Sequence, residues 1–191
     1  MELSEQDFIE AASEINCERA VIKAIVEIES RGSGFLADRR PVILFEGHWF
    51  SRYTNHVYDR THPKISYPKW TKKFYLGGAR EYERFNEALA LNRRAALMST
   101  SYGLFQIMGF NFALCGFADV ESFYAAMCRS ERDQLRAFVN LIKSTRLDDE
   151  LREKRWAAFA YQYNGESYRV NRYDERLAAA YRKHSTGQGG I

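Results

Sequence analysis

The sequence is poor in the residues that cross-link or interrupt small folds, with three cysteines and three prolines among 191 residues. An odd cysteine count without a C-x-x-C pair argues against a disulfide scaffold or a zinc knuckle, so we expect reduced, buried thiols. No apolar run approaches about 18 residues, so the sequence predicts no transmembrane segment. The first residues are acidic and lead directly into a helical pattern, which argues against a signal peptide and predicts synthesis in a cytoplasm.

Disorder is excluded for most of the chain, because 46% apolar and 28% charged residues are close to the globular average. The length is sufficient for one domain or for two small lobes that share a cleft. The formal charge of +3 suits an anionic polymer such as nucleic acid, anionic lipid or bacterial cell wall, but is too small to choose among them. We expect only the tail over 185–191 to be disordered.

Helical signals begin at the N-terminus. Ser4 and Asp7 resemble a capping box for a first helix that reaches about residue 15. Asn16 is the candidate cap of a second helix over 17–30, whose apolar positions cover most of its circumference. This second helix is therefore expected to be buried.

The middle of the chain contains the only predicted strand. The apolar run 41–45 predicts a strand that forms one arm of a small hairpin near residues 35–45. Asp119 and Ser130 are candidate helix caps. Further helices are expected near 79–91, 93–98, 102–114, 119–128, 131–145, 149–162 and 174–184. The fold class is therefore mostly α with a small β element.

Two carboxylates stand near the end of the second predicted helix. Residues three and four apart share a helix face, so Glu27 lies above Lys23 and has a cation to pair with. Glu29 lies above Ile22 and Ile25, in the last turn, where the helix dipole is negative. Both surroundings disfavour the anion, so we expect a raised pKa for Glu29, as in a carboxylic acid that donates a proton. The structural alternative is a helix-end glutamate in solvent.

Two further segments carry polar side chains beside a glycine. Within 99–109, three hydroxyl residues precede a glycine, and Gln106 stands among apolar residues and needs a hydrogen-bond partner. That partner is either the protein backbone or a bound sugar. Later, Tyr163 and Asn164 precede Gly165, which fits a helix C-terminus. They would present a ring and an amide at the rim of a groove, or else form an ordinary cap with core tyrosines.

Other chemistries lack their motifs. The four histidines do not have metal-binding spacing, and the sequence contains no G-x-S-x-G, P-loop or G-x-G-x-x-G motif. Acidic residues interleave the arginines, which argues against the basic stripe of a nucleic-acid binder. We therefore expect no cofactor, no metal and no nucleic acid partner.

The order of these elements resembles a known family. Glu29-Ser30, then Ser101-x-Gly103-Leu104-x-Gln106-Ile107, then Tyr163-Asn164-Gly165 resemble the three motifs of the lysozyme superfamily branch that includes goose-type lysozymes and lytic transglycosylases. The stretches 20–50 and 103–109 are more specifically similar to the N-acetylmuramidase domain of bacteriophage endolysins. The resemblance spans residues 5–184. It implies a lysozyme-like fold with a substrate cleft between two lobes, and one catalytic domain over 1–184 without a separate wall-binding domain.

The resemblance also implies a reaction, namely cleavage of the β-1,4 bond between N-acetylmuramic acid and N-acetylglucosamine in peptidoglycan. Glu29 would protonate the glycosidic oxygen. A second carboxylate is normally expected for the oxocarbenium-like transition state, and Asp38 and Glu46 are the candidates. Without one, Thr100 and Ser101 would hold the attacking water. The residues expected to contact the sugar are Gln106, Tyr163 and Asn164.

Several alternatives stay open from the sequence. If the C6 hydroxyl of muramic acid attacks instead of water, the enzyme is a lytic transglycosylase with an anhydro product. A non-catalytic wall-binding or phage structural module is a different class, which the apolar setting of Glu29 disfavours. The resemblance further implies a monomer that binds glycan strands without stable membrane insertion. It would be made in the host bacterial cytoplasm and would reach the periplasmic wall through a separate pore.

Overall fold

The computed structural model describes residues 2–29 and 33–186. Its helices are α1 Glu5–Glu14, α2 Arg19–Glu29, α3 Gly47–Tyr53, α4 Glu81–Leu91, α5 Arg93–Met98, α6 Val120–Arg129, α7 Glu131–Ser144, α8 Asp148–Arg152, α9 Trp156–Asn164 and α10 Tyr173–Thr186. The strands are β1 Ile43–Phe45, β2 Thr100–Tyr102 and β3 Ile107–Met108, and the 3₁₀ turns are η1 Gly78–Arg80, η2 Gly109–Asn111 and η3 Glu166–Arg169. The predicted fold class, mostly α with a small β element, is confirmed.

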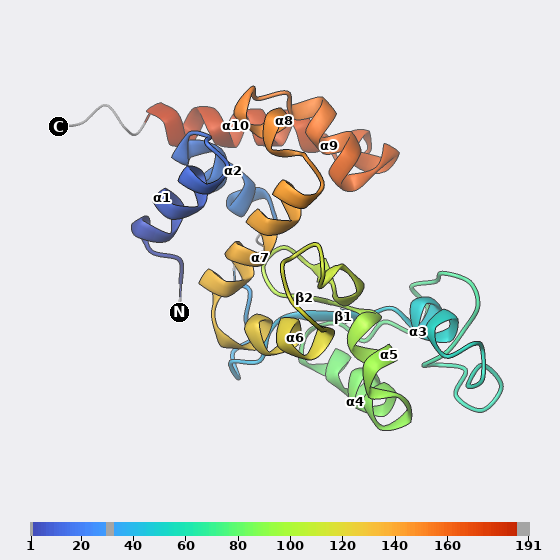
Figure 1. The fold of residues 1–191 in the computed structure, drawn as a ribbon. Coiled ribbons are helices and arrows are strands. Elements are labelled where there is room, and N and C mark those ends of the chain that lie inside the picture. Colours follow the sequence, from blue (N-terminus) through green and yellow to red (C-terminus); the bar gives the residue numbers. More distant parts are fainter. Residues whose placement is uncertain (1, 30–32, 187–191) are drawn as a thin grey trace.

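The helices and the sheet form two lobes (Figure 1). One end of the molecule gathers α1, α2, α8, α9 and α10, and the other holds the sheet with α3, α4 and α5. Helix α7 lies between them, in contact with α1 on one side and α6 on the other. None of the described helices is long and apolar enough to cross a bilayer.

The start of the chain shows one confirmed cap and one error. Ser4 and Asp7 form the predicted capping box, in which the Asp7 carboxylate accepts the Ser4 N–H at 2.8 Å. The prediction that Asn16 caps the second helix is wrong, because Asn16 has a left-handed φ of 51°. The amides of Asn16 and Cys17 instead donate to carbonyls in the last turn of α1. This geometry ends a helix, and α2 begins only at Arg19.

Helix α2 is the buried axis of the helical lobe. Val21, Ile22 and Ile25 are fully buried, and both α1 and α10 pack along the helix. Burial of each such side chain contributes about 1.5–3 kcal/mol to stability. Glu29 is therefore the last residue of a helix that is packed along its length.

The sheet joins two segments that are distant in the sequence. Strand β1 pairs antiparallel with β2, with Ile43 opposite Tyr102, and β2 continues antiparallel into β3. The predicted hairpin near 35–45 is present as a short antiparallel turn, with a bridge between Phe35 and Pro41 and backbone hydrogen bonds from Val42 to Gly34 at 2.9 Å and from Leu36 to Arg40 at 2.8 Å. The sheet partner of the predicted strand is β2, a segment for which the sequence predicted no strand.

The predicted helix over 102–114 is wrong. Gly103 and Gln106 have φ values of 70° and 47°, which turn the chain back between β2 and β3 and exclude a helix. Under this turn lies the buried amide of Gln134 from α7, whose Oε1 accepts the N–H of Leu104 at 2.8 Å. A Cβ on Gly103 would lie 2.4 Å from that amide, so both conformation and space require glycine.

The C-terminal half follows the prediction with two corrections. The predicted caps Asp119 and Ser130 accept backbone N–H groups at the starts of α6 and α7. The single helix expected over 149–162 is divided into α8 and α9, because Lys154 has a left-handed φ of 56°. Helix α10 continues to Thr186, so the start of the expected tail is helical, and residues 187–191 lie outside the described part of the chain.

All three cysteines are free thiols. Cys115 is buried, as expected, whereas Cys17 and Cys128 are only half-buried. Burial raises the pKa of Cys17 and of Cys115 to about 12, so both thiols are protonated at neutral pH.

Candidate active site

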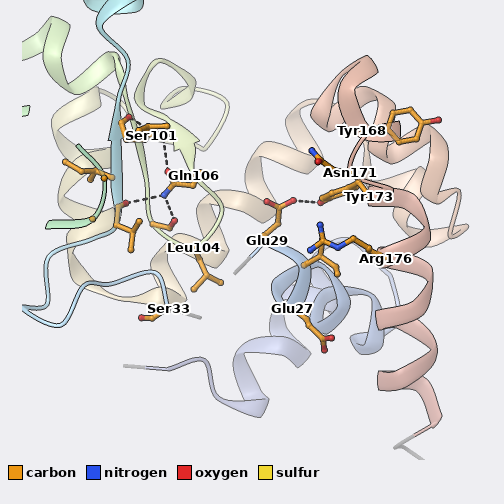
Figure 2. A pocket seen from close by; sticks show the side chains of 17 residues that line it. Glu27, Glu29, Ser33, Ser101, Leu104, Gln106, Tyr168, Asn171, Tyr173 and Arg176 are labelled. Atoms are coloured by element: carbon orange, nitrogen blue, oxygen red, sulfur yellow. Dashed lines mark hydrogen bonds between the residues drawn. The ribbon is translucent and has the colours of Figure 1, made fainter. Parts of the chain in front are cut away.

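A cleft of about 920 Å³ separates the helical lobe from the sheet (Figure 2). Glu29, Tyr173 and Arg176 line its helical wall, and Ser101 and Gln106 line the opposite wall. The remaining lining residues are Glu27, Ile28, Ser33, Val42, Ile43, Leu44, Gly77, Gly78, Gly103, Leu104, Tyr168 and Asn171. The cleft thus combines a few polar groups with apolar walls, as ligand sites commonly do.

A second cavity of about 460 Å³ continues this cleft. It shares Glu29 and Gln106 with the first cavity and is bordered further along by Tyr163, Gln162 and Asn111. Glu29 therefore stands where the two cavities meet. A polymer that lies in both cavities would have units on either side of this carboxyl group.

The pKa of Glu29 is raised, as expected from the sequence. The cause is burial of the carboxyl group, which opposes its ionisation. The Tyr173 hydroxyl donates a hydrogen bond to Oε1 of Glu29, and the charge of Arg176 acts in the same direction, so both partly lower this pKa. Desolvation is the largest of these effects, and the net shift favours the protonated acid.

The neighbouring carboxylate behaves in the opposite way, although its expected partner is wrong. Lys23 contacts Glu5 at 2.7 Å, whereas the carboxylate of Glu27 contacts Lys183 at 2.9 Å and His184 at 2.8 Å. Helix α10 lies along α2 and brings these cations from the far end of the chain. The hydrogen bond from Lys183 lowers the pKa of Glu27. Two glutamates on one helix thus have opposite pKa shifts.

The partner that Gln106 requires is the protein itself. Its Nε2 donates to the carbonyl of Gly103 at 2.8 Å and to that of Val42 at 3.3 Å. The Ser101 hydroxyl donates to Oε1 of Gln106 at 3.0 Å. These bonds fix the amide at the cleft wall, and an oxygen lone pair on each of the two side chains is left to accept a further hydrogen bond.

Two of the predicted site residues face away from the cleft. Thr100 is fully buried, and its hydroxyl donates to the carbonyl of Ala96 at 2.8 Å inside the protein. Asp38 is exposed and accepts the backbone N–H of Arg40 at 3.1 Å together with its guanidinium group. Asp38 is therefore the turn residue that hydrogen-bonds its own backbone. Neither residue borders either cavity.

Glu46 also lies outside both cavities. Its carboxylate accepts a hydrogen bond from the Tyr75 hydroxyl at 2.7 Å and lies 3.3 Å from Nδ1 of His48. These contacts attach Tyr75 to Glu46 and so help to hold the loop before η1 in place. Among the described residues, the carboxylates that line the cleft are Glu27 and Glu29.

Tyr163 borders the second cavity beside Glu29, but its ring is not simply exposed at a rim. It stacks on Phe159 with ring centres 5.4 Å apart and meets Phe138 edge-on at 5.8 Å. Burial raises the pKa of Tyr163 well above its usual range, and the charge of Glu29 adds to this effect. Asn164 ends α9, and its side chain lies outside the described part of the structure.

Tyr173 and Arg176 line the cleft, although no sequence motif pointed to either residue. They stand three residues apart on α10 and therefore share one face of that helix. The i, i+3 spacing is visible in the sequence, but the packing of α10 along α2 is not. Within the described ranges, no cluster of three or more His, Cys, Asp or Glu side chains could hold a metal ion.

Comparisons with known proteins agree with this geometry. The sequence profile of the N-acetylmuramidase family matches residues 18–185. The crystal structure of an endolysin from Burkholderia phage AP3 is similar, with 38% sequence identity and a TM-score of 0.91. The alignment covers 96% of this chain and 72% of that endolysin. No curated protein matches the chain. The family match over residues 18–185, together with the similarity in fold to this endolysin, shows that this protein belongs to the N-acetylmuramidase family of glycoside hydrolases.

Proposed function

We propose that the protein is an endolysin that cleaves the β-1,4 bond between N-acetylmuramic acid and N-acetylglucosamine in peptidoglycan, with Glu29 as the general acid. The observation that carries the proposal is the half-buried carboxyl group of Glu29 at the junction of two cavities. Burial raises the pKa of Glu29, which favours the protonated form that a general acid requires. The similarity to a phage endolysin supports the same substrate class.

The contacts of Glu29 suit proton donation. Tyr173 holds Oε1, so Oε2 would carry the proton to the glycosidic oxygen. After the transfer, the carboxylate is stabilised by the Tyr173 hydroxyl and by the positive charge of Arg176, since both lower its pKa. Both groups favour the carboxylate, and their interaction with Glu29 strengthens as negative charge develops on it, which lowers the barrier to proton transfer.

The attacking group would be an oxygen nucleophile without a second carboxylate. Glu27 is already engaged by Lys183 and His184, and neither Asp38 nor Glu46 borders the cleft. The Ser101 hydroxyl and the Gln106 amide face Glu29 across the cleft and have lone pairs to accept from a water. We therefore propose hydrolysis by a water held at this wall.

Mass spectrometry of digested, purified peptidoglycan tests the proposal. Hydrolysis at the proposed bond yields fragments with N-acetylmuramic acid at a reducing end. Anhydromuramic ends would identify a lytic transglycosylase, in which the muramic C6 hydroxyl replaces the water. N-acetylglucosamine at the reducing end would contradict the bond assignment, and the absence of any fragment would indicate a non-catalytic wall-binding module.

A further inference from the structure

The net positive charge of this protein depends on residues 60–80, which we call the basic segment. It holds six cations and no aspartate or glutamate. The cations are Arg60, Lys64, Lys69, Lys72, Lys73 and Arg80. The whole chain has 28 lysines and arginines against 25 acidic residues, so without this segment 22 cations face 25 acids, a net charge of −3. The basic segment alone makes the protein cationic.

These cations are available for a partner. All six are exposed, and of them only Arg80 takes part in an ion pair with the described residues, at 3.4 Å from Glu83. Elsewhere, exposed cations commonly contact carboxylates, as Arg132 does with Glu10 at 2.6 Å. The lysines of the basic segment therefore present amines to solvent that no described carboxylate pairs with.

The segment also presents an aromatic surface. Trp70 is 58% exposed and stands between Lys69 and Lys72, with the Lys72 amine 5.7 Å from the centre of its ring. An exposed tryptophan among cations is typical of a binding surface, because a large rigid ring supplies contact area at low entropic cost. The exposed lysine amines and the exposed Trp70 ring thus lie on the same stretch of loop.

Buried hydrogen bonds hold this loop in place. Glu81, which is fully buried, accepts the N–H groups of Leu76 and Gly77 at 2.9 and 3.1 Å. Arg84 donates to the carbonyl of Lys64 at 3.3 Å and to the Tyr67 hydroxyl at 3.2 Å. A loop anchored in this way presents its side chains to a partner with little ordering cost.

The basic segment is continuous with the cleft. Gly77 and Gly78 belong to it and line the cleft wall opposite the helical lobe. Lys73 precedes Gly77 by four residues, so its backbone lies within about 14 Å of the cleft. Figure 1 shows the teal-to-green loop that follows α3 at the right of the view, at the end of the molecule remote from α10. A polymer that leaves the cleft on this side would meet the lysines next.

We propose that the basic segment is a second binding surface for peptidoglycan, outside the cleft. Its lysines would bind the carboxylates of the stem peptides, and Trp70 would pack against a sugar face. The partner is a polyanion because the segment has no acidic residue. Continuity with the cleft favours the wall over a lipid bilayer, and Trp70 is flanked by charges rather than by further apolar residues suited to insertion. This inference rests on the proposed function.

The test compares two triple variants with the same change in net charge. In the first, Lys69, Lys72 and Lys73 are each replaced by Glu. In the control, Arg94, Arg136 and Arg182 are each replaced by Glu; these are exposed helical residues, outside both cavities and without ion pairs among the described residues. Each protein is co-sedimented with purified insoluble peptidoglycan, and its turnover of a soluble glycan tetrasaccharide without stem peptides is measured. Thermal melts verify folding.

We expect the first triple variant, with Lys69, Lys72 and Lys73 replaced (the loop variant), to bind insoluble peptidoglycan at least tenfold more weakly than the wild type. Its rate of tetrasaccharide cleavage should stay within twofold of the wild-type rate. The control variant should stay within twofold in both assays. Equal loss of binding in both variants would show that only net charge matters, and unchanged binding of the loop variant would overturn the proposal. So would loop-dependent binding to phosphatidylglycerol vesicles without binding to peptidoglycan. A wild type that sediments with the wall but cleaves nothing would refute the proposed function and leave the binding surface standing.

Discussion

Replacement of Glu29 with Gln removes the transferable proton and little else. Glutamine has nearly the shape of the protonated acid, and its oxygen still accepts the hydrogen bond from Tyr173. General-acid catalysis contributes about 10²–10⁴-fold to rate. This corresponds to about 2.7–5.5 kcal/mol of transition-state stabilisation, at about 1.4 kcal/mol for each factor of ten. Because a sugar alkoxide is a poor leaving group, we expect the loss of lytic activity to lie near the upper end.

The same replacement should preserve or increase stability at neutral pH. Burial raises the pKa of Glu29 in the folded protein above its ordinary value of 4.5. The stabilising contribution of this group is therefore fully present below pH 4.5 and is lost as the pH rises through the folded-state pKa. Glutamine does not titrate. The melting temperature of Glu29→Gln relative to wild type should consequently rise with increasing pH over this range.

The matched comparison is Glu27→Gln, on the same helix. Glu27 is exposed at the cleft edge, where Lys183 and His184 hold its carboxylate, so its replacement should cost about 0–1 kcal/mol of stability and little activity. Activity is measured as turbidity loss of outer-membrane-permeabilised Gram-negative cells, with thermal melts as the folding control. If Glu29→Gln still lyses cells and Glu27→Gln does not, the wrong carboxylate has been chosen and the argument from burial fails.

Four further predictions follow from the same contacts. Tyr173→Phe removes a donor that lowers the pKa of Glu29, so the alkaline limb of the pH–activity profile should shift to higher pH; an unchanged limb would contradict this coupling. Tyr163→Ala should weaken activity and, because the ring is stacked, also lower stability by about 2 kcal/mol or more, whereas Tyr163→Phe should retain the stability. Gly103→Ala should destabilise the protein by more than about 1 kcal/mol in a denaturant titration, because φ is 70° and the amide of Gln134 occupies the space of a Cβ. Lysis should decline with ionic strength, because attraction to the anionic wall is screened over about 8–10 Å at physiological salt; a flat salt profile would exclude steering by charge.

The sequence by itself determined the features that depend on near neighbours. The caps at Ser4, Asp119 and Ser130 were predictable because each joins residues three apart. The buried face of α2 was predictable from its periodicity, and with it the unusual setting of Glu29. The motif order also indicated the groups that border the cleft, namely Ser101, Gln106 and Tyr163.

Only the tertiary structure decided which distant groups meet. Glu27 pairs with Lys183 rather than Lys23, and Tyr173 reaches Glu29, because α10 packs along α2. The pairing of β1 with β2 turns the Thr100 hydroxyl inward, although Thr100 and Ser101 look equivalent in the sequence. Successive side chains of a strand point to opposite faces, so only the pairing decides which one reaches the cleft. Local propensity carries no information about such contacts, since they depend on how whole elements bury their apolar faces against one another.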